Sequence, residues 1–158
     1  MEEPLIEARG LDKSFAFSPV LRSVNLKVYA GCGAMAVGRN GIGKSTLVRI
    51  LAGLAAPSAG EALLFGRPSR TLEADDRRRI GLVSHQSFLY PNLTACENLE
   101  FFAALYRLKP RSGGIAGEIV RWLDRVGLAA AANERVSAFS RGMEQRLGLA
   151  RALMPAPD

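Results

Sequence analysis

Eight consecutive residues have the types and spacing of a phosphate-binding loop. They read Gly38-Arg39-Asn40-Gly41-Ile42-Gly43-Lys44-Ser45 and fit the pattern G-x-x-x-x-G-K-[ST] at every fixed position. Glycine lets backbone N–H groups come close enough to surround phosphate oxygens. Lys44 is expected to reach the β- and γ-phosphates, and the Ser45 hydroxyl to bind Mg²⁺. The pattern predicts a nucleoside triphosphate site rather than an ordinary glycine-rich turn.

The segments on either side of the loop fit this interpretation. Ala34-Met35-Ala36-Val37 is a short apolar run, typical of a buried strand in a parallel sheet. After the loop, apolar residues at i, i+3, i+4 and i+7 predict a helix from about Lys44, with its positive dipole end toward the anion. These residues are Leu47, Ile50, Leu51 and Leu54. A competing G-x-G-x-x-A pattern at 31–36 is discounted because a strand, not a helix, follows it.

The rest of the chain predicts a mixed architecture. Residues from Leu5 to about Val28 suggest two antiparallel strands around Ser18-Pro19, and further strands are expected at 61–65 and 80–83. Thr94-Ala95-Cys96-Glu97 has the form of a capping box that starts a helix, and a second amphipathic helix ends at Gly127. We therefore expect an α/β part over about 1–87 and 136–158, with a helical subdomain inserted over about 88–135.

Composition limits the class of protein. With 158 residues and 48% hydrophobic content, the chain has room for one globular domain. No apolar run approaches a membrane span and the start lacks a secretion signal, so we expect a soluble, cytosolic polypeptide. Cys32 and Cys96 match no metal-ligand spacing and are interpreted as small, buried or half-buried free thiols. The charge of +6 includes a cluster at 77–79, but nearby acidic residues offset it and no aromatics interleave, so no nucleic-acid partner is expected.

A second anion site is suggested near the end of the chain. Phe139-Ser140-Arg141-Gly142-Met143 precedes a run with helical spacing, so Ser140 is a good N-cap and Gly142 allows close approach. A simple helix cap would look the same. Two phosphate-seeking helix ends on one small chain are expected to complete each other's sites across a two-fold dimer.

Together these motifs resemble the ATP-binding subunit of ATP-binding cassette (ABC) transporters. Residues 38–45 match the Walker A loop, Gln86 the Q-loop glutamine, and residues 139–143 the signature pentapeptide, in the family's order and spacing. The resemblance implies an α/β P-loop NTPase fold with a mainly parallel sheet, an antiparallel N-terminal part and a helical subdomain. Phe139 and Arg141 depart from the usual Leu and Gly. His85 is not the family's switch histidine and is interpreted as structural.

The resemblance also implies the roles of individual residues. Lys44 and Gln86 are expected to act in catalysis, and Ser45 and Gln86 to hold Mg²⁺. Phe15 falls where the family has an aromatic side chain that stacks on adenine. The implied ATP-binding residues are Phe15, Gly38, Arg39, Asn40, Gly41, Ile42, Gly43, Lys44, Ser45, Thr46, Ser140, Arg141, Gly142 and Met143.

The implied partners are transmembrane permease subunits and a second ATP-binding domain, with the chain peripheral on the cytoplasmic face of the inner membrane. Residues 90–99 and 140–146 look most like the heme-exporter ATPase subunit of cytochrome c biogenesis. Two other interpretations of the function stay open. One is a soluble ABC-type ATPase acting on nucleic acid or ribosomes, and the other is a non-catalytic nucleotide-binding remnant.

The sequence ends at Asp158, before the position of the family's Walker B carboxylates. Those carboxylates hold Mg²⁺ and polarise the attacking water, so we expect residues 1–158 alone to bind ATP weakly and to lack appreciable ATPase activity. Poor stability is expected as well, because a parallel sheet without an inner strand exposes its edges.

Overall fold

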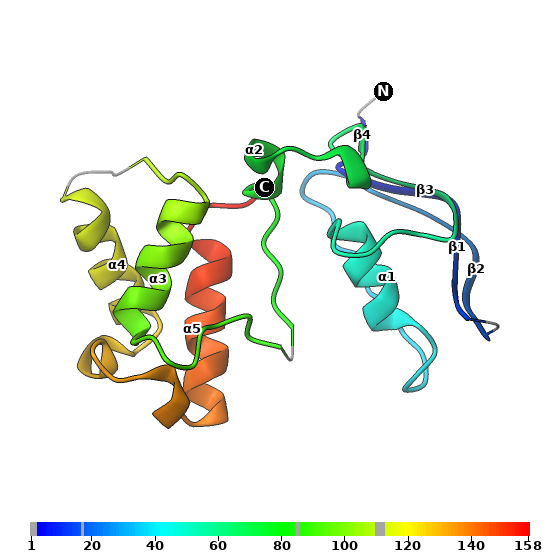
Figure 1. Cartoon of the computed structure of the whole chain (residues 1–158). Helices are drawn as coiled ribbons and strands as arrows, with labels where there is room; N and C mark the ends of the chain where they lie inside the picture. Colours follow the sequence, from blue (N-terminus) through cyan, green and yellow to red (C-terminus); the bar gives the residue numbers. More distant parts are fainter. Residues whose placement is uncertain (1–2, 17, 85, 110–112) are drawn as a thin grey trace. The chain divides into compact units, whose positions relative to one another are not determined.

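The computed structural model describes residues 3–16, 18–84, 86–109 and 113–158. His85 therefore lies outside the described residues. The chain forms two compact units, Met1–Glu73 and Ala74–Asp158. Figure 1 shows the strands and α1 in the first unit and the helices α2 to α5 in the second. Each unit is described by itself below.

The first unit is built on an antiparallel sheet in the order β2-β1-β3-β4. Its strands are β1 (Ile6–Phe15), β2 (Ser18–Val28), β3 (Ala59–Leu64) and β4 (Arg67–Pro68), followed by the short 3₁₀ helix η1 (Ser69–Thr71). β1 and β2 pair from Ile6–Val28 to Phe15–Ser18, and β1 also pairs with β3. The hairpin predicted from the alternation in residues 5–28 is confirmed.

Helix α1 (Lys44–Leu51) packs against the sheet of this unit (Figure 1). Ile50 is fully buried in a cluster with Leu11, Leu21 and Ala62 from three strands. The helix ends at Leu51, so Leu54 lies beyond it and is 49% exposed. The predicted helix is confirmed, but it is shorter than the apolar spacing indicated.

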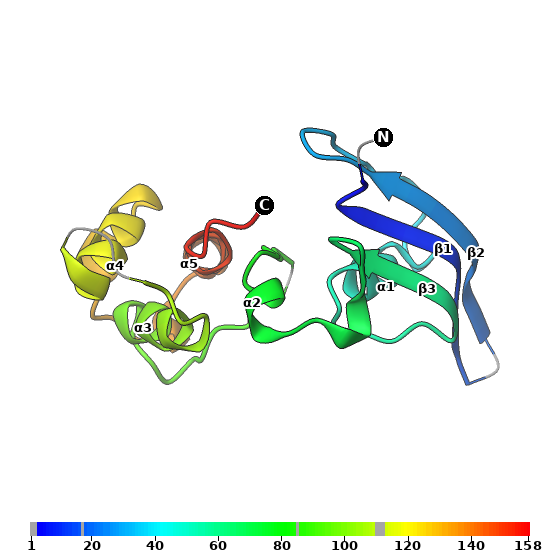
Figure 2. The ribbon, with the colours of Figure 1, turned by 90° about the horizontal axis from the view of Figure 1, so that it is seen from above.

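The second unit is a helical cluster. It contains α2 (Ala74–Arg77), α3 (Ala95–Leu105), α4 (Gly114–Arg125) and α5 (Arg141–Leu153), with 3₁₀ turns η2 (Ala129–Ala131) and η3 (Val136–Ala138). Leu99, Ile119, Leu123 and Leu147, from three of these helices, are buried in one core. Figure 2 shows α5 nearly end-on beside α3 and α4. α5 therefore shares its core with the predicted helical subdomain, and the sequence-based assignment of 136–158 to the α/β part stays a prediction.

Local signals define the ends of these helices. The Thr94 N–H donates to Glu97 Oε2 at 2.7 Å, and the Glu97 N–H donates to Thr94 Oγ1 at 3.1 Å, which completes the predicted capping box. Gly127, at φ 65°, ends α4 as expected. Cys32 and Cys96 are free thiols, but Cys32 is exposed rather than buried, and burial raises the pKa of Cys96.

The parallel strands expected from the sequence are not formed among the described residues. Every strand pair in the described residues is antiparallel, and the two segments predicted as parallel strands, 34–37 and 80–83, belong to no strand. Met35 and Val37 are 86% and 83% exposed. A parallel strand forms only when neighbouring strands hydrogen-bond to it and helices cover its faces, and neither segment has these partners here. No described helix has both the length and the apolar content that a membrane crossing requires.

Candidate nucleotide site

The predicted phosphate loop leads directly into α1, and its glycines explain its conformation. Gly41 and Gly43 have φ of 83° and 107°, which side chains other than glycine rarely adopt. A Cβ on Gly43 would lie 2.8 Å from Val20 Cγ1 and 3.0 Å from the Val20 carbonyl oxygen. Gly43 therefore lets the loop pass close over β2 at the point where α1 begins.

The N-terminus of α1 is open to an anion. Gly43 is its N-cap and offers no side chain to the first-turn N–H groups. These groups and the positive end of the helix dipole form an arrangement that favours phosphate. Ser45 is exposed in this turn and Thr46 is half-buried. Hydroxyl oxygen is a ligand type that Mg²⁺ accepts beside phosphate oxygens and water.

Lys44 is anchored on the loop itself. Its ammonium donates to the carbonyl oxygens of Gly38 at 2.6 Å and Arg39 at 2.8 Å. An ammonium has three N–H donors, so these bonds occupy two of them. One donor remains to reach a phosphate oxygen while the other two hold the loop in a tight curve.

Phe15 lies at the end of the same hairpin that supports the loop. It is the last residue of β1, pairs with Ser18 and is 54% exposed. Gly43 packs on Val20 and Leu21, only a few positions along β2 from Ser18. The Lys13 ammonium, held by the Ala56 carbonyl, lies 5.0 Å from the centre of the Phe15 ring. An exposed ring beside a phosphate loop is a suitable surface for a planar base.

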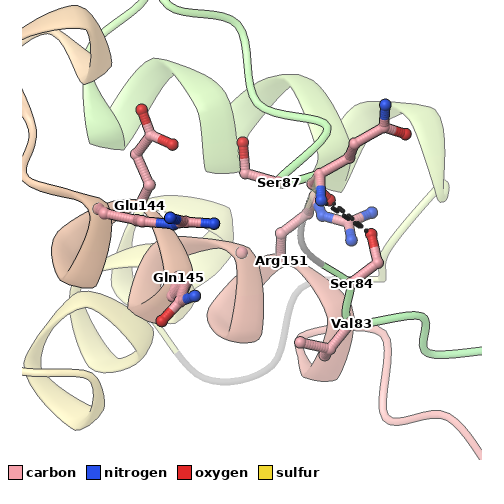
Figure 3. Close-up of a pocket in the computed structure, with 9 residues that line it drawn as sticks. Val83, Ser84, Ser87, Glu144, Gln145 and Arg151 are labelled. Atoms are coloured by element: carbon pink, nitrogen blue, oxygen red, sulfur yellow. Dashed lines mark hydrogen bonds between the residues drawn. The ribbon is translucent and has the colours of Figure 1, made fainter. Parts of the chain in front are cut away.

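The remaining predicted residues belong to the second unit, where Gln86 and Arg141 line one small cavity of about 40 Å³. Figure 3 shows its lining, which comes from Val83, Ser84, Gln86 and Ser87 and from one face of α5. Gln86 is exposed, and its backbone is fixed by Ser84, whose hydroxyl accepts from the Gln86 N–H and donates to the Gln86 carbonyl. The cavity has room for a water molecule or two.

Ser140 caps α5 as predicted. Its hydroxyl accepts a hydrogen bond from the Met143 N–H at 3.3 Å. Ser140, Arg141 and Gly142 are exposed, so the start of α5 is accessible to a ligand. Arg141 lines the cavity together with Glu144, which places the unusual arginine of the signature next to a carboxylate.

The structure thus groups the predicted residues in two sets. Phe15 and residues 38–46 lie in the first unit, and Gln86 and residues 140–143 lie in the second. Sequence reasoning missed one further residue of the second unit. Arg151 is buried and donates from Nη2 to the Leu82 carbonyl at 2.7 Å. An arginine in the last turn of a helix gave no signal beyond a favourable dipole position.

Comparison with known proteins agrees with these motifs. A family model described as ABC transporter matches residues 21–158. YdbJ of Bacillus subtilis, an uncharacterized ABC transporter ATP-binding protein, is 34% identical over an alignment that covers 99% of this chain and 49% of YdbJ. YbhF of Escherichia coli, a probable multidrug ABC transporter ATP-binding protein, is 35% identical over 99% of this chain and 27% of its own length. The chain thus spans about half or less of these two relatives.

Solved structures confirm the fold class. The ATP-binding cassette MJ0796, in a dimeric post-hydrolysis state with ADP and Pi, has a TM-score of 0.84 and 29% identity, covering 96% of this chain and 70% of MJ0796. An ATP-binding subunit of an ABC transporter has a TM-score of 0.83 and 27% identity, covering 97% of this chain and 63% of that one. Both are P-loop NTPase domains. Given the loop, the signature helix and these similarities, the chain belongs to the ABC transporter family, as an ATP-binding domain.

Proposed function

We propose that this chain binds ATP through residues 38–46 and, in the complete protein, couples ATP binding and hydrolysis to transport across a membrane. The observation that carries the proposal is the uncapped N-terminus of α1 behind a loop whose glycines have positive φ. Backbone N–H groups, the α1 dipole and Lys44 then converge on one anion. Phe15 provides a surface for the base.

Magnesium fits the same site. Ser45 in α1 offers a hydroxyl oxygen. The resemblance to the family adds the Gln86 amide oxygen as a second proposed ligand, and both are oxygen donors of the kind Mg²⁺ prefers. The described residues contain no cluster of His, Cys, Asp and Glu that could hold a metal alone. Most of the coordination is therefore expected from phosphate oxygens and water. The ion would offset phosphate charge when bound.

Dimerisation and a membrane partner are part of this proposal. The accessible start of α5, capped by Ser140, suits a phosphate on a second ATP-binding domain better than one on its own chain. Tyr90, Phe101 and Leu105 expose large apolar side chains on and before α3. They support a contact with permease subunits near Gln86, at the cytoplasmic face of the membrane.

The transported cargo is the most specific part of the proposal. Residues 90–99 and 140–146 favour heme export for cytochrome c biogenesis. The two relatives above are described as uncharacterized and as probable multidrug proteins. Heme-dependent stimulation of ATPase activity in the complete transporter would support the heme assignment, whereas stimulation by other hydrophobic compounds alone would contradict it.

The proposal is tested by titration calorimetry with ATP and Mg²⁺ on the wild-type protein and on Lys44→Ala. A hydrogen bond to a charged group contributes about 1.5–3 kcal/mol, so we expect Lys44→Ala to weaken binding by about ten- to a hundredfold. Lys27→Ala is the matched control, because it removes the same charge from the same unit where Lys27 pairs with Glu7 at 3.3 Å. Equal affinity in the wild type and Lys44→Ala would overturn the role of Lys44.

A further inference from the structure

Arg151 lies in an unusual environment at the end of α5. It is 7% exposed, and no described carboxylate forms an ion pair with it. Its Nη2 donates to the Leu82 carbonyl, while its Nε is buried without a hydrogen-bond partner in the described part of the chain. A buried, unpaired charge opposes folding, and an apolar side chain of similar volume is often the more stable choice. Stability alone therefore does not explain why an arginine occupies this position.

Aromatic rings complete this environment. The guanidinium lies 5.5 Å from the centre of the Phe88 ring and 5.3 Å from that of Phe102. Such cation–π contacts compensate part of the lost hydration. Phe102 belongs to α3, whereas Phe88 and Leu82 lie at the two ends of the segment that carries Gln86. One side chain thus fixes both ends of this segment to α5.

The backbone of this segment has one unusual conformation. Phe88 has φ of 55°, a left-handed conformation that costs about 1–2 kcal/mol for a residue with a side chain. Such conformations persist where the surroundings impose them, and they often mark functional segments. On the facing side, Gly148 of α5 leaves room for Ser87, whose backbone would lie 3.8 Å from an added Cβ. Figure 3 shows Arg151 and Ser87 on this face of α5.

We infer that Arg151 is a positioning residue that holds Gln86 in register with the signature end of α5. The catalytic consequence of this inference rests on the proposed ATPase function, but the contacts of Arg151 with Leu82 and Phe88 are independent of that function. Arg151 touches no nucleotide in this scheme. It acts through the Leu82 carbonyl and the Phe88 ring, so its loss is expected to disturb the placement of Gln86 and not the phosphate loop.

Hydrogen exchange on the complete protein tests the fixation. In Arg151→Met we expect the amides of Gln86, Ser87 and Phe88 to exchange at least about tenfold faster than in the wild type. Arg146→Met is the matched control, because Arg146 is also an arginine of α5 that donates to two carbonyls, those of Val126 and Gly127 at 3.0 Å, but on another side of the helix. It should leave these three amides unchanged.

Phe88→Leu is the second variant, in case Arg151→Met does not fold. Phe88 is 40% exposed, so its substitution removes the aromatic contact with little effect on the core. We expect the same faster exchange at Gln86 and Ser87. Unchanged exchange of these amides in folded Arg151→Met, or in Phe88→Leu when the former does not fold, would overturn the inference.

Kinetics separate positioning from general destabilisation. We expect Arg151→Met to lower kcat by about tenfold and to leave KM for ATP within about twofold, since displacement of a catalytic group acts mainly on the chemical step. In a Gln86→Ala background the same substitution should lower kcat by less than about twofold, because residues that act together are not additive. A full tenfold loss in that background would overturn the inference. A wild type without ATPase activity would instead contradict the proposed function, and the exchange experiment would still decide the role of Arg151.

Discussion

The loop glycines differ in a way that permits a sharp test of the site geometry. Gly43 and Gly41 both have positive φ, 107° and 83°, so alanine is strained at either position. Only at Gly43 would the new Cβ meet other atoms, at 2.8 Å from Val20 Cγ1 and at 3.0 Å from Leu21 Cδ2 and the Val20 oxygen. At Gly41 there is nothing within 4 Å. The two substitutions share the backbone strain and differ in the steric term.

The expected magnitudes follow from these two terms. A left-handed conformation costs an alanine about 1–2 kcal/mol, and overpacking of this kind adds about 1–3 kcal/mol. Gly41→Ala should therefore lower the free energy of unfolding by about 1–2 kcal/mol and Gly43→Ala by about 2–5 kcal/mol. Relaxation is limited at Gly43, because one of the atoms in the way belongs to the β2 backbone.

Two measurements distinguish global from local effects. Urea-induced unfolding gives the global free energy of each variant. The Leu47 amide donates to the Gly43 carbonyl at 2.9 Å, so its hydrogen exchange reports opening of the first turn of α1. Gly43→Ala should lower the global stability or the protection of Leu47 by at least about 1 kcal/mol more than Gly41→Ala does. If the two variants were equal in both measurements, the close packing of the loop on β2 would be refuted.

Two further predictions concern the scaffold of each unit. Gly60→Ala should lower the free energy of unfolding of the first unit by more than about 4 kcal/mol, because the new Cβ would lie 2.1 Å from the Gly10 oxygen. Gly10→Ala, whose Cβ would have nothing within 4 Å, should lower it by about 1–2 kcal/mol. Urea unfolding compares the two variants, and equal losses would contradict the close packing at Gly60. In the second unit, the hydrogen bond from the Thr94 N–H lowers the pKa of Glu97 below its ordinary value. The stability that this carboxylate contributes is therefore present above its unfolded pKa and is lost as pH falls through its folded pKa. The difference in Tm between the wild type and Glu97→Gln should therefore shrink between pH 7 and pH 3, and a constant difference would exclude this linkage.

The parts of the fold that the sequence predicted well depend on local interactions. Thr94 and Glu97 are three residues apart and cap α3 as their types indicate. Ser140 caps α5 within one turn, and Gly127 ends α4 within a few residues of its last apolar contact. Each of these features is decided by atoms that the sequence already brings together. No knowledge of the tertiary structure was needed.

Predictions failed where non-local partners decide the outcome. Met35 and Val37 are apolar enough for a buried strand, but a strand needs a neighbouring strand for its hydrogen bonds. The same applies to residues 80–83, whose Leu82 carbonyl is satisfied by Arg151 instead of a ladder. Composition and periodicity describe what a segment tolerates. They do not show which distant residue will supply its hydrogen-bond partner, which for the Leu82 carbonyl is Arg151, 69 positions away.

The candidate site shows the same difference between local features and features that depend on distant residues. The phosphate loop could be proposed from the sequence because a continuous motif contains nearly all of its chemistry. In the structure Gly41 and Gly43 have positive φ, and Lys44 donates to the Gly38 carbonyl. Arg151 was not predictable, because its importance comes from burial and from two rings in other segments. Its sequence position resembles any basic residue near a helix C-terminus.

The position of Arg151 on α5 also explains why one helix serves two functions. Arg151 lies ten positions after Arg141, so at 1.5 Å per residue the two lie about 15 Å apart along the axis. Ser140 presents the first turn to a ligand, while Arg151 fixes the Leu82 carbonyl near the other end. A helix of this length behaves as a stiff rod, since bending requires strained or broken internal hydrogen bonds. We therefore expect a displacement of the capped end to reach the segment that carries Gln86 through the Arg151–Leu82 hydrogen bond.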